Sequence, residues 1–159
     1  MQHLAYIMLG SNIRPVENTR FAIRMLSEQF KIQSISTTWE TKAIGSKAPN
    51  FLNTALVLSV QHNPEVLKHE FFRPMEEKLG RIRFADKNAP RTIDIDCLIF
   101  DQEILDPAIW EMAHLAIPLS ELIPYLNKPG TTLTLSETAQ KLLQNNQVIP
   151  RADLRFDWR

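Results

Sequence analysis

The spacing of apolar residues predicts alternating strands and helices over the first hundred positions. Residues 4–9 form an apolar run typical of a buried strand, which Gly10-Ser11-Asn12 ends. From about Pro15, apolar residues recur at helical spacing, which predicts a helix with its proline in the tolerated first turn. Residues 31–40 and 50–60 are rich in alternating and β-branched side chains, so each is predicted to form a strand.

A second helix is predicted between residues 64 and 80. Asn63 is a good N-cap, Pro64 suits the first turn, and Gly80 is a typical stop. Pro74 lies inside this helix, where it has no N–H to donate to the carbonyl four residues earlier. We therefore expect a kink or a π-bulge near Pro74.

A fourth strand, residues 93–100, completes the order β-α-β-β-α-β. This order is that of an α+β, ferredoxin-like fold with an antiparallel sheet and both helices on one face, which leaves the other face available. Beyond this core, residues 118–126 predict a short helix, Lys128-Pro129-Gly130 predicts a turn, and Ser136 is expected to cap a helix to about Gln144. These elements form a C-terminal helical extension.

The chain is expected to form a single domain, residues 1–159, because no linker, repeat or low-complexity tract divides it. Residues 151–159 fit either a packed strand or a loose tail. The pattern of apolar residues leaves both possibilities open.

Composition excludes several function classes. Eighteen basic side chains balance 18 acidic ones, so no global field favours nucleic acid or an anionic membrane. The single cysteine, Cys97, excludes an internal disulfide and a multi-cysteine metal cluster. No apolar run reaches membrane-spanning length, and the first residues lack the regions of a signal peptide. We expect a cytoplasmic monomer that binds neither membranes nor nucleic acid.

Two carboxylates in the fourth strand suggest a metal site. Alternation places Asp94 and Asp96 on one face with Leu98 and Phe100, while residues 93, 95, 97 and 99 share the other face. Two residues of strand span roughly 6.6–6.8 Å, so both carboxylates could approach the same one or two hard cations, for which Mg²⁺ is well suited. The alternative is a solvated strand face.

Three arginines near this strand suggest a phosphate site. Arg81, Arg83 and Arg91 bracket a loop that leads into the acidic strand, and guanidinium groups grip phosphate oxygens in pairs. Ion pairs with neighbouring surface acids are the alternative interpretation of these arginines alone. Phosphate beside metal is typical of phosphoryl transfer, although the sequence has neither a P-loop nor a kinase glycine loop.

Four motifs occur in a specific order at compatible spacing. They are Ala5-Tyr6-Ile7-Met8-Leu9-Gly10-Ser11-Asn12, Phe51-Leu52-Asn53, Gly80-Arg81-Ile82-Arg83 and Pro90-Arg91-Thr92-Ile93-Asp94-Ile95-Asp96. Together they resemble the 6-hydroxymethyl-7,8-dihydropterin pyrophosphokinase family of folate biosynthesis. The resemblance runs from about residue 4 to residue 100 and resumes weakly near residues 113–119.

The resemblance implies transfer of a pyrophosphoryl group from ATP to the hydroxymethyl oxygen of a dihydropterin, with release of AMP. Positioning and charge neutralisation would supply most of the catalysis. It also implies that Asp94 and Asp96 hold two Mg²⁺ ions between the ATP phosphates. Arg81 and Arg91 join them as catalytic residues, and the ATP-binding set implied is Glu76, Arg81, Arg83, Arg91 and Ile99.

On the pterin side, the resemblance implies that Asn53 reads the ring edge and that Phe51 stacks on the ring. The backbone segment Thr41, Lys42, Ala43 and Ile44 would read the polar edge of the pterin. His114 stands where the family places a second stacking aromatic. Phe51 as plain core, Asn53 as a satisfied strand-end amide and His114 as a structural histidine are the alternatives.

Three features depart from the family pattern. Lys42 stands where the family typically has proline. The interval between Pro64 and Glu76 is one residue longer than usual, which would suit a bulge at Pro74. Between Ile104 and Leu119, the segment that usually brings imidazole and basic contacts to the ATP phosphates is missing.

Two other functions remain as hypotheses. One is a catalytically altered or silent homologue that binds ATP or a pterin, or acts on a different acceptor. The other is a ferredoxin-like nucleic-acid module, which the neutral charge and the lack of paired exposed aromatics disfavour.

Overall fold

A single antiparallel sheet organises the chain. The computed structural model describes residues 1–43 and 47–159, and within that part every strand joins one sheet, in the order β6-β5-β1-β4-β3-β7 with β2 also paired to β4. The strands are β1 (His3–Ser11), β2 (Lys31–Ile35), β3 (Trp39–Thr41), β4 (Phe51–Val60), β5 (Asp94–Phe100), β6 (Glu103–Ile104) and β7 (Val148–Pro150).

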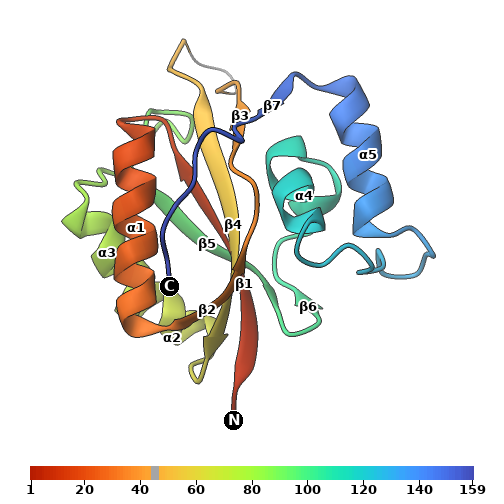
Figure 1. Ribbon diagram of the computed structural model, residues 1–159, viewed down its shortest axis with the longest axis horizontal. Coiled ribbons are helices and arrows are strands. Elements are labelled where there is room, and N and C mark those ends of the chain that lie inside the picture. Colours follow the sequence, from red (N-terminus) through yellow and green to blue (C-terminus); the bar gives the residue numbers. More distant parts are fainter. Residues whose placement is uncertain (44–46) are drawn as a thin grey trace.

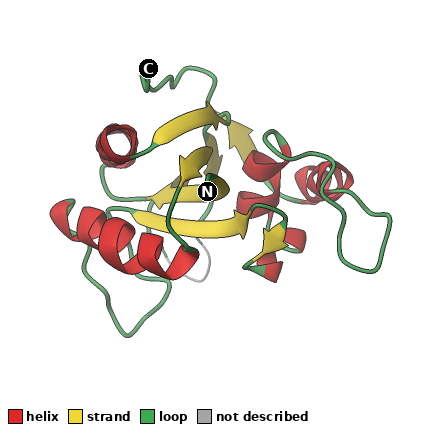
Figure 2. Ribbon diagram, turned by 90° about the horizontal axis from the view of Figure 1, so that it is seen from below, coloured by secondary structure: helices red, strands yellow, loops and turns green. Residues whose placement is uncertain are grey.

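Helices cover both faces of this sheet (Figure 1). The group formed by α1, η1 and α3 lies on one face, and α4 and α5 lie beyond the other; Figure 2 shows the strands between these groups. The helices are α1 (Pro15–Gln29), α2 (Pro64–Val66), the π-helix η1 (Leu67–Phe72), α3 (Arg73–Lys78), the 3-10 helix η2 (Pro107–Trp110), α4 (Ala113–Ser120) and α5 (Leu135–Asn145).

The predicted ferredoxin-like order is confirmed, because β1 lies between β4 and β5 and pairs antiparallel with both. The expectation that the second face stays available is wrong over most of that face. Buried side chains of η2, α4 and α5 form an apolar cluster with it, and only one end of the face remains open. In the described residues, no helix is long and apolar enough to span a membrane.

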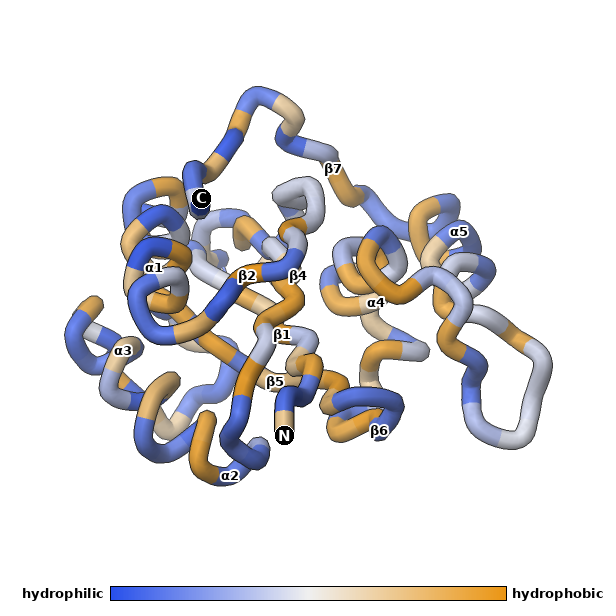
Figure 3. Tube along the Cα trace, turned by 60° about the horizontal axis from the view of Figure 1, so that its bottom comes forward, coloured by the Kyte–Doolittle hydropathy of each residue, from blue (hydrophilic) through white to orange (hydrophobic). Residues whose placement is uncertain are grey.

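Alternation along β1 divides the core in two. Ala5, Ile7 and Leu9 point toward α1, whereas Tyr6 and Met8 point toward α4. In Figure 3 the central strands and α4 show hydrophobic colours, and α1 shows a hydrophilic outer face. Each sheet face thus has its own apolar cluster, and both clusters share the central strands.

The predicted irregularity at Pro74 is confirmed as a π-helix. The segment η1 ends just before Pro74, and the backbone N–H of Arg73 donates to the carbonyl of Lys68, five residues earlier. Because proline has no N–H to donate, the wider turn before it accommodates the missing bond. The helix then continues to Lys78 and buries Met75 and Glu76.

The single strand predicted over residues 31–40 is wrong, because it is interrupted between β2 and β3. At the interruption the Ser36 N–H donates to the carbonyl of Ala55, and Ser36 Oγ accepts from the Ala55 N–H at 2.9 Å. A side-chain oxygen therefore replaces a carbonyl of the ladder. Hydroxyl groups that compete with backbone acceptors in this way are a known cause of local interruptions.

The predicted alternation along β5 is correct only for its first half. The pairing with β1 shifts register between Tyr6 and Ile7, opposite Cys97 and Ile99. Beyond this bulge, Ile99 packs in the cluster on the α4 side and Phe100 packs toward α1, which reverses their predicted faces. Asp94 and Asp96 lie before the bulge and share one face as expected.

Both helices predicted in the C-terminal third exist, but the bounds of one and the capping residue of the other differ from the predictions. The helix expected over residues 118–126 is α4, which begins earlier and contains Pro118 in its last turn. The cap of α5 is Thr134 rather than Ser136, because Thr134 and Glu137 form a reciprocal capping box. The strands β6 and β7 and the helix η2 were not predicted, since each is too short to show a period.

Residues 151–159 are packed but do not form a strand. Phe156 is buried in the cluster beneath α1, with Leu154 and Trp158 beside it. The guanidinium of Arg20 in α1 lies 5.8 Å from the Phe156 ring centroid. This segment closes the outer edge of the core.

We predict that Phe156→Ala lowers the free energy of unfolding by roughly 3 kcal/mol, the usual loss for a buried phenylalanine. Tyr125→Ala, at a ring that is 84% exposed, is the matched control and should change stability little. Urea denaturation followed by circular dichroism measures both. Equal stabilities of the two variants would contradict the packing role of the C-terminal segment.

Candidate active site

A polar cavity of about 260 Å³ opens at the uncovered end of the sheet. Side chains from the sheet, the loop before β5, and the first turn of α4 form its wall. The polar cavity is lined by Met8, Gly10, Thr41, Lys42, Phe51, Asn53, Lys87, Asn88, Arg91, Asp94, Asp96, His114 and Leu115.

Strand register explains why these residues meet. Gly10 in β1 pairs with Asn53 on β4 and with Asp94 on β5. Gly10 therefore lies between Asn53, which is predicted to read the pterin edge, and Asp94, which is predicted to bind the metal. A Cβ at Gly10 would lie 3.4 Å from Asn53 Oδ1 and 3.9 Å from Phe51, so a side chain there would crowd the cavity floor.

A second cavity of about 330 Å³ adjoins the polar cavity. We call it the arginine cavity, and it is lined by Arg81, Arg83, Phe84, Asp86, Lys87, Ala89, Arg91, Asp94 and Asp96. The two cavities share Lys87, Arg91, Asp94 and Asp96. The predicted metal ligands thus lie at the junction of two binding spaces.

Ion pairs connect the carboxylates at this junction to the arginines. Arg81 Nε donates to Asp94 Oδ1 at 3.0 Å, and Arg91 Nη1 donates to Asp94 Oδ2. Deeper in the structure, Glu76 accepts from Arg83 Nη2 at 2.7 Å and from the backbone N–H of Ile95 at 2.9 Å. All three arginines predicted for phosphate binding are therefore paired with carboxylates at this site.

The acids at the junction disfavour one another's charge. Burial, supported by the nearby charge of Asp94, raises the pKa of Glu76 to about 7. The same two causes raise the pKa of Asp96 to about 6, although this carboxylate keeps an exposed surface in the cavity. A cation at this position would relieve the repulsion.

The carboxylates fit Mg²⁺ by their chemistry. Asp94 and Asp96 offer hard oxygen ligands from one strand face, and the adjoining cavities leave space for waters and phosphates, which Mg²⁺ retains or prefers. Within the described residues, no three His, Cys, Asp or Glu side chains gather into a self-contained metal site. An ion here would therefore need oxygen ligands from water or substrate.

Asn12 fixes the loop that carries Arg91. Its side-chain oxygen accepts from the Arg91 N–H at 2.8 Å, and its own N–H donates to the Arg91 carbonyl at 3.1 Å. Asn12 Nδ2 also donates to the carbonyl of Pro49 at 3.2 Å. One buried side chain thus connects the loops on both sides of the cavity. The sequence predicts that Asn12 ends the first strand and places it in a family motif, but does not predict that it connects these loops.

The pterin-side residues surround the other half of the polar cavity. Asn53 is 2% exposed, and its Nδ2 donates to Thr41 Oγ1 at 2.8 Å. The guanidinium of Arg91 lies 5.6 Å from the Phe51 ring centroid. Burial, together with the charge of Arg91, holds the pKa of His114 below its usual value, so its ring is neutral at pH 7 and could stack on a planar ligand.

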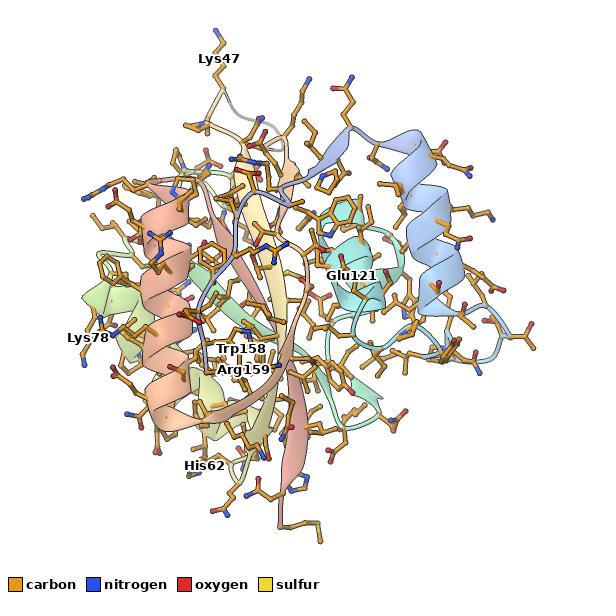
Figure 4. All side chains as sticks on the ribbon, viewed as in Figure 1. Lys47, His62, Lys78, Glu121, Trp158 and Arg159 are labelled. Carbon is orange, nitrogen blue, oxygen red and sulfur yellow. The ribbon has the colours of Figure 1, made fainter. Side chains whose placement is uncertain are left out.

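Glu121 joins two walls of the polar cavity. It follows α4, which carries His114, and its carboxylate accepts from Trp39 Nε1 at 2.7 Å and from the Thr37 N–H at 2.8 Å. Trp39 begins β3, the strand that ends at Thr41. Figure 4 labels Glu121 beside α4. This contact sets the separation between the α4 wall and the β3 wall.

Not every predicted site residue reaches the cavities. Ile99 is fully buried in the apolar cluster, because the β5 bulge turns it toward α4, and Glu76 lies buried behind the junction. Ala43 is half-buried and lines neither cavity, and Ile44 lies outside the described residues. Lining residues that were not predicted are Met8, Gly10, Lys87, Asn88 and Leu115 in the polar cavity, and Phe84, Asp86 and Ala89 in the arginine cavity.

We predict that Glu76 makes the metal-free protein less stable as pH rises. Its pKa is about 7 when folded and 4.5 ordinarily, so the folded chain retains a proton that the unfolded chain loses between these values. The free energy of unfolding should therefore fall between about pH 4.5 and pH 7, by ~3 kcal/mol for this group. Urea denaturation in EDTA across this range measures it.

In the Glu76→Gln variant the side chain cannot ionise, so this variant should lack the pH-dependent fall in the free energy of unfolding. The control variant Glu77→Gln changes an exposed neighbour and should show the same fall as wild type. Identical pH slopes for wild type and Glu76→Gln would contradict the assignment.

Comparisons with known proteins agree with this geometry. The family described as 7,8-dihydro-6-hydroxymethylpterin-pyrophosphokinase (HPPK) matches residues 6–124. The 2-amino-4-hydroxy-6-hydroxymethyldihydropteridine pyrophosphokinase of Bacillus subtilis is 31% identical over 153 residues, which cover 89% of each chain. The protein of that name from Synechocystis is 28% identical and covers 88% of this chain and 76% of its own.

Solved structures show the same fold. The wild-type HPPK-DHPS of Plasmodium falciparum, crystallised with pteroate, superposes with a TM-score of 0.68 at 12% identity. The match covers 91% of this chain but only 43% of the Plasmodium chain, so the present chain spans less than half of that protein. On the family match and the Bacillus relative together, the chain belongs to the 7,8-dihydro-6-hydroxymethylpterin-pyrophosphokinase family, whose members are ATP-dependent pyrophosphokinases of folate biosynthesis.

Proposed function

We propose that this chain catalyses the Mg²⁺-dependent transfer of pyrophosphate from ATP to 6-hydroxymethyl-7,8-dihydropterin. The observation that carries this proposal is the junction of the two cavities, where Asp94, Asp96 and Arg91 border both spaces. A nucleotide in the arginine cavity and a planar acceptor in the polar cavity would meet at the carboxylates. Bringing two reactants together in this way supplies a large part of catalysis.

The products define the reacting atoms. The hydroxymethyl oxygen of the pterin forms a bond to the β-phosphorus of ATP. The bond between that phosphorus and the oxygen bridging to the α-phosphate breaks, and its electron pair leaves with AMP. The hydroxyl proton passes to solvent. The pterin diphosphate and AMP together contain every atom of the reactants except that proton.

The side chains have separate roles in this proposal. Asp94 and Asp96 would hold Mg²⁺, which when bound neutralises the phosphate oxygens near the reacting phosphorus. Arg81, Arg83 and Arg91 would exchange their carboxylate partners for phosphate oxygens when the nucleotide binds. Such an exchange retains charge compensation for the arginines at every stage.

On the acceptor side, Asn53 and Thr41 would read the polar edge of the pterin. Phe51 and the neutral ring of His114 would stack on its faces, with Thr41 and Lys42 forming the rim. We further propose that the enzyme acts as a single-domain monomer, because this chain by itself supplies the carboxylates, the arginines and the acceptor-side residues named above. We place it in the cytoplasm, since its single cysteine fits a reducing compartment. Light scattering of the purified protein with and without substrates tests the monomer.

We predict that Asp94→Asn or Asp96→Asn abolishes turnover while leaving the fold intact, because each removes charge from the metal site. The assay incubates the purified protein with ATP, Mg²⁺ and 6-hydroxymethyl-7,8-dihydropterin, and follows AMP and the pterin product by HPLC. The control is Asp157→Asn, which changes an exposed acid that lines neither cavity. This variant should keep wild-type turnover.

Full activity in either site variant would refute the metal assignment. Wild-type protein that binds ATP or the pterin tightly without forming AMP would favour a catalytically silent homologue.

Glu121→Ala should raise the KM for the pterin by roughly threefold to tenfold with kcat little changed, because loss of the hydrogen bonds to Trp39 in β3 and to Thr37 just before it loosens the acceptor cavity. Glu111→Ala, at an exposed acid before α4, should leave both constants unchanged. Steady-state kinetics at saturating ATP distinguish the two variants. A loss confined to kcat would contradict a positioning role for Glu121.

A further inference from the structure

Two lysines at the polar cavity have no carboxylate partner among the described residues. Lys42 and Lys87 are exposed and line the cavity, and within the described part of the chain neither takes part in an ion pair with Asp or Glu. The arginines differ, since Arg81 and Arg91 both bind Asp94 and Arg83 binds Glu76. The lysines are thus cations beside the acids that are still available to an incoming anion.

The two lysines occupy different sides of the junction. Lys87 borders both cavities, whereas Lys42 borders the polar cavity alone. Lys42 directly follows β3, next to Thr41, which contacts Asn53. Lys42 therefore belongs to the acceptor side, whereas Lys87 lies at the junction.

We propose that Lys42 binds the diphosphoryl group on the acceptor side as it passes from ATP to the hydroxymethyl oxygen. This inference rests on the proposed function and adds a phosphate-binding residue to the cavity assigned to the pterin. The pterin is uncharged at its hydroxymethyl group, whereas the product carries a diphosphate there. A cation in the acceptor space therefore binds the transferred diphosphate more tightly than it binds the uncharged pterin alcohol.

Lys42 takes no proton in this step. Its ammonium group donates hydrogen bonds to the phosphate oxygens while the bond to the acceptor oxygen forms and the bond to AMP breaks. Its flexible four-carbon stem allows the charge to follow the moving group, which a paired guanidinium is less free to do. Lys42 thus stabilises charge that arrives in the acceptor space only during transfer, and such contacts raise kcat more than they lower KM.

The test compares Lys42→Met with Lys42→Arg and with Lys47→Met. Lys47 belongs to the same loop, and Figure 4 shows its side chain projecting away from the molecule at the loop tip. Isothermal titration calorimetry measures the binding of the pterin diphosphate and of the pterin alcohol to each variant, and the HPLC assay measures kcat and KM.

We expect Lys42→Met to lower kcat by about tenfold and to weaken binding of the pterin diphosphate by about tenfold, the usual loss for a charge-assisted hydrogen bond. Binding of the alcohol should change by less than about twofold, since it offers no phosphate to the lysine. Lys42→Arg should restore most of both properties, and Lys47→Met should resemble wild type. Equal losses for the alcohol and the diphosphate, or a Lys42→Met variant that behaves as Lys47→Met does, would overturn the proposal.

Failure of the proposed function gives a different result. Wild-type protein that forms no AMP contradicts the pyrophosphokinase proposal by itself. Titration with inorganic diphosphate then decides the role of Lys42 without turnover. Weaker binding by Lys42→Met than by Lys47→Met supports the lysine as a phosphate ligand, and equal binding overturns it.

Discussion

Compensation of negative charge at the start of β5 is the constraint on which the site depends. Burial raises the pKa of Glu76 and of Asp96, and the nearby charge of Asp94 raises both further. Arginines from the loop before β5 supply the opposite charge, so the position of that loop is tied to the acids. The energetic cost of uncompensated carboxylates therefore organises the walls of both cavities.

Irregular backbone places the charged groups where they act. The π-helix before Pro74 precedes the turn that buries Glu76 against β5, and the bulge of β5 follows directly after the acidic pair. Both irregularities adjoin the site, as bulges and π-turns often do. Because of these irregularities, α3 and β5 place their acidic side chains at the open end of the sheet while the rest of each element packs in the core.

The C-terminal third completes the site by covering most of one sheet face. The helix η2 buries Trp110 and leads into α4, which brings His114 and Leu115 to the cavity. Glu121 then joins the end of α4 to β3. Because these elements leave only one end of the face open, the acceptor space is a cavity rather than an exposed sheet.

The local pattern of residues was sufficient for the order of the core elements, the irregularity at Pro74 and the shared face of Asp94 and Asp96. These features depend on side-chain periodicity and proline chemistry within one segment, and the order of four motifs indicated the family. Other features needed the tertiary structure: the break at Ser36, the reversal of Ile99, the position of α4 and the presence of Lys87 in the cavity. Each of these depends on a partner distant in the sequence, such as Ala55 for Ser36 or β1 for the β5 bulge. Local periodicity contains no information about such partners, so only the packed chain decides which side chains meet.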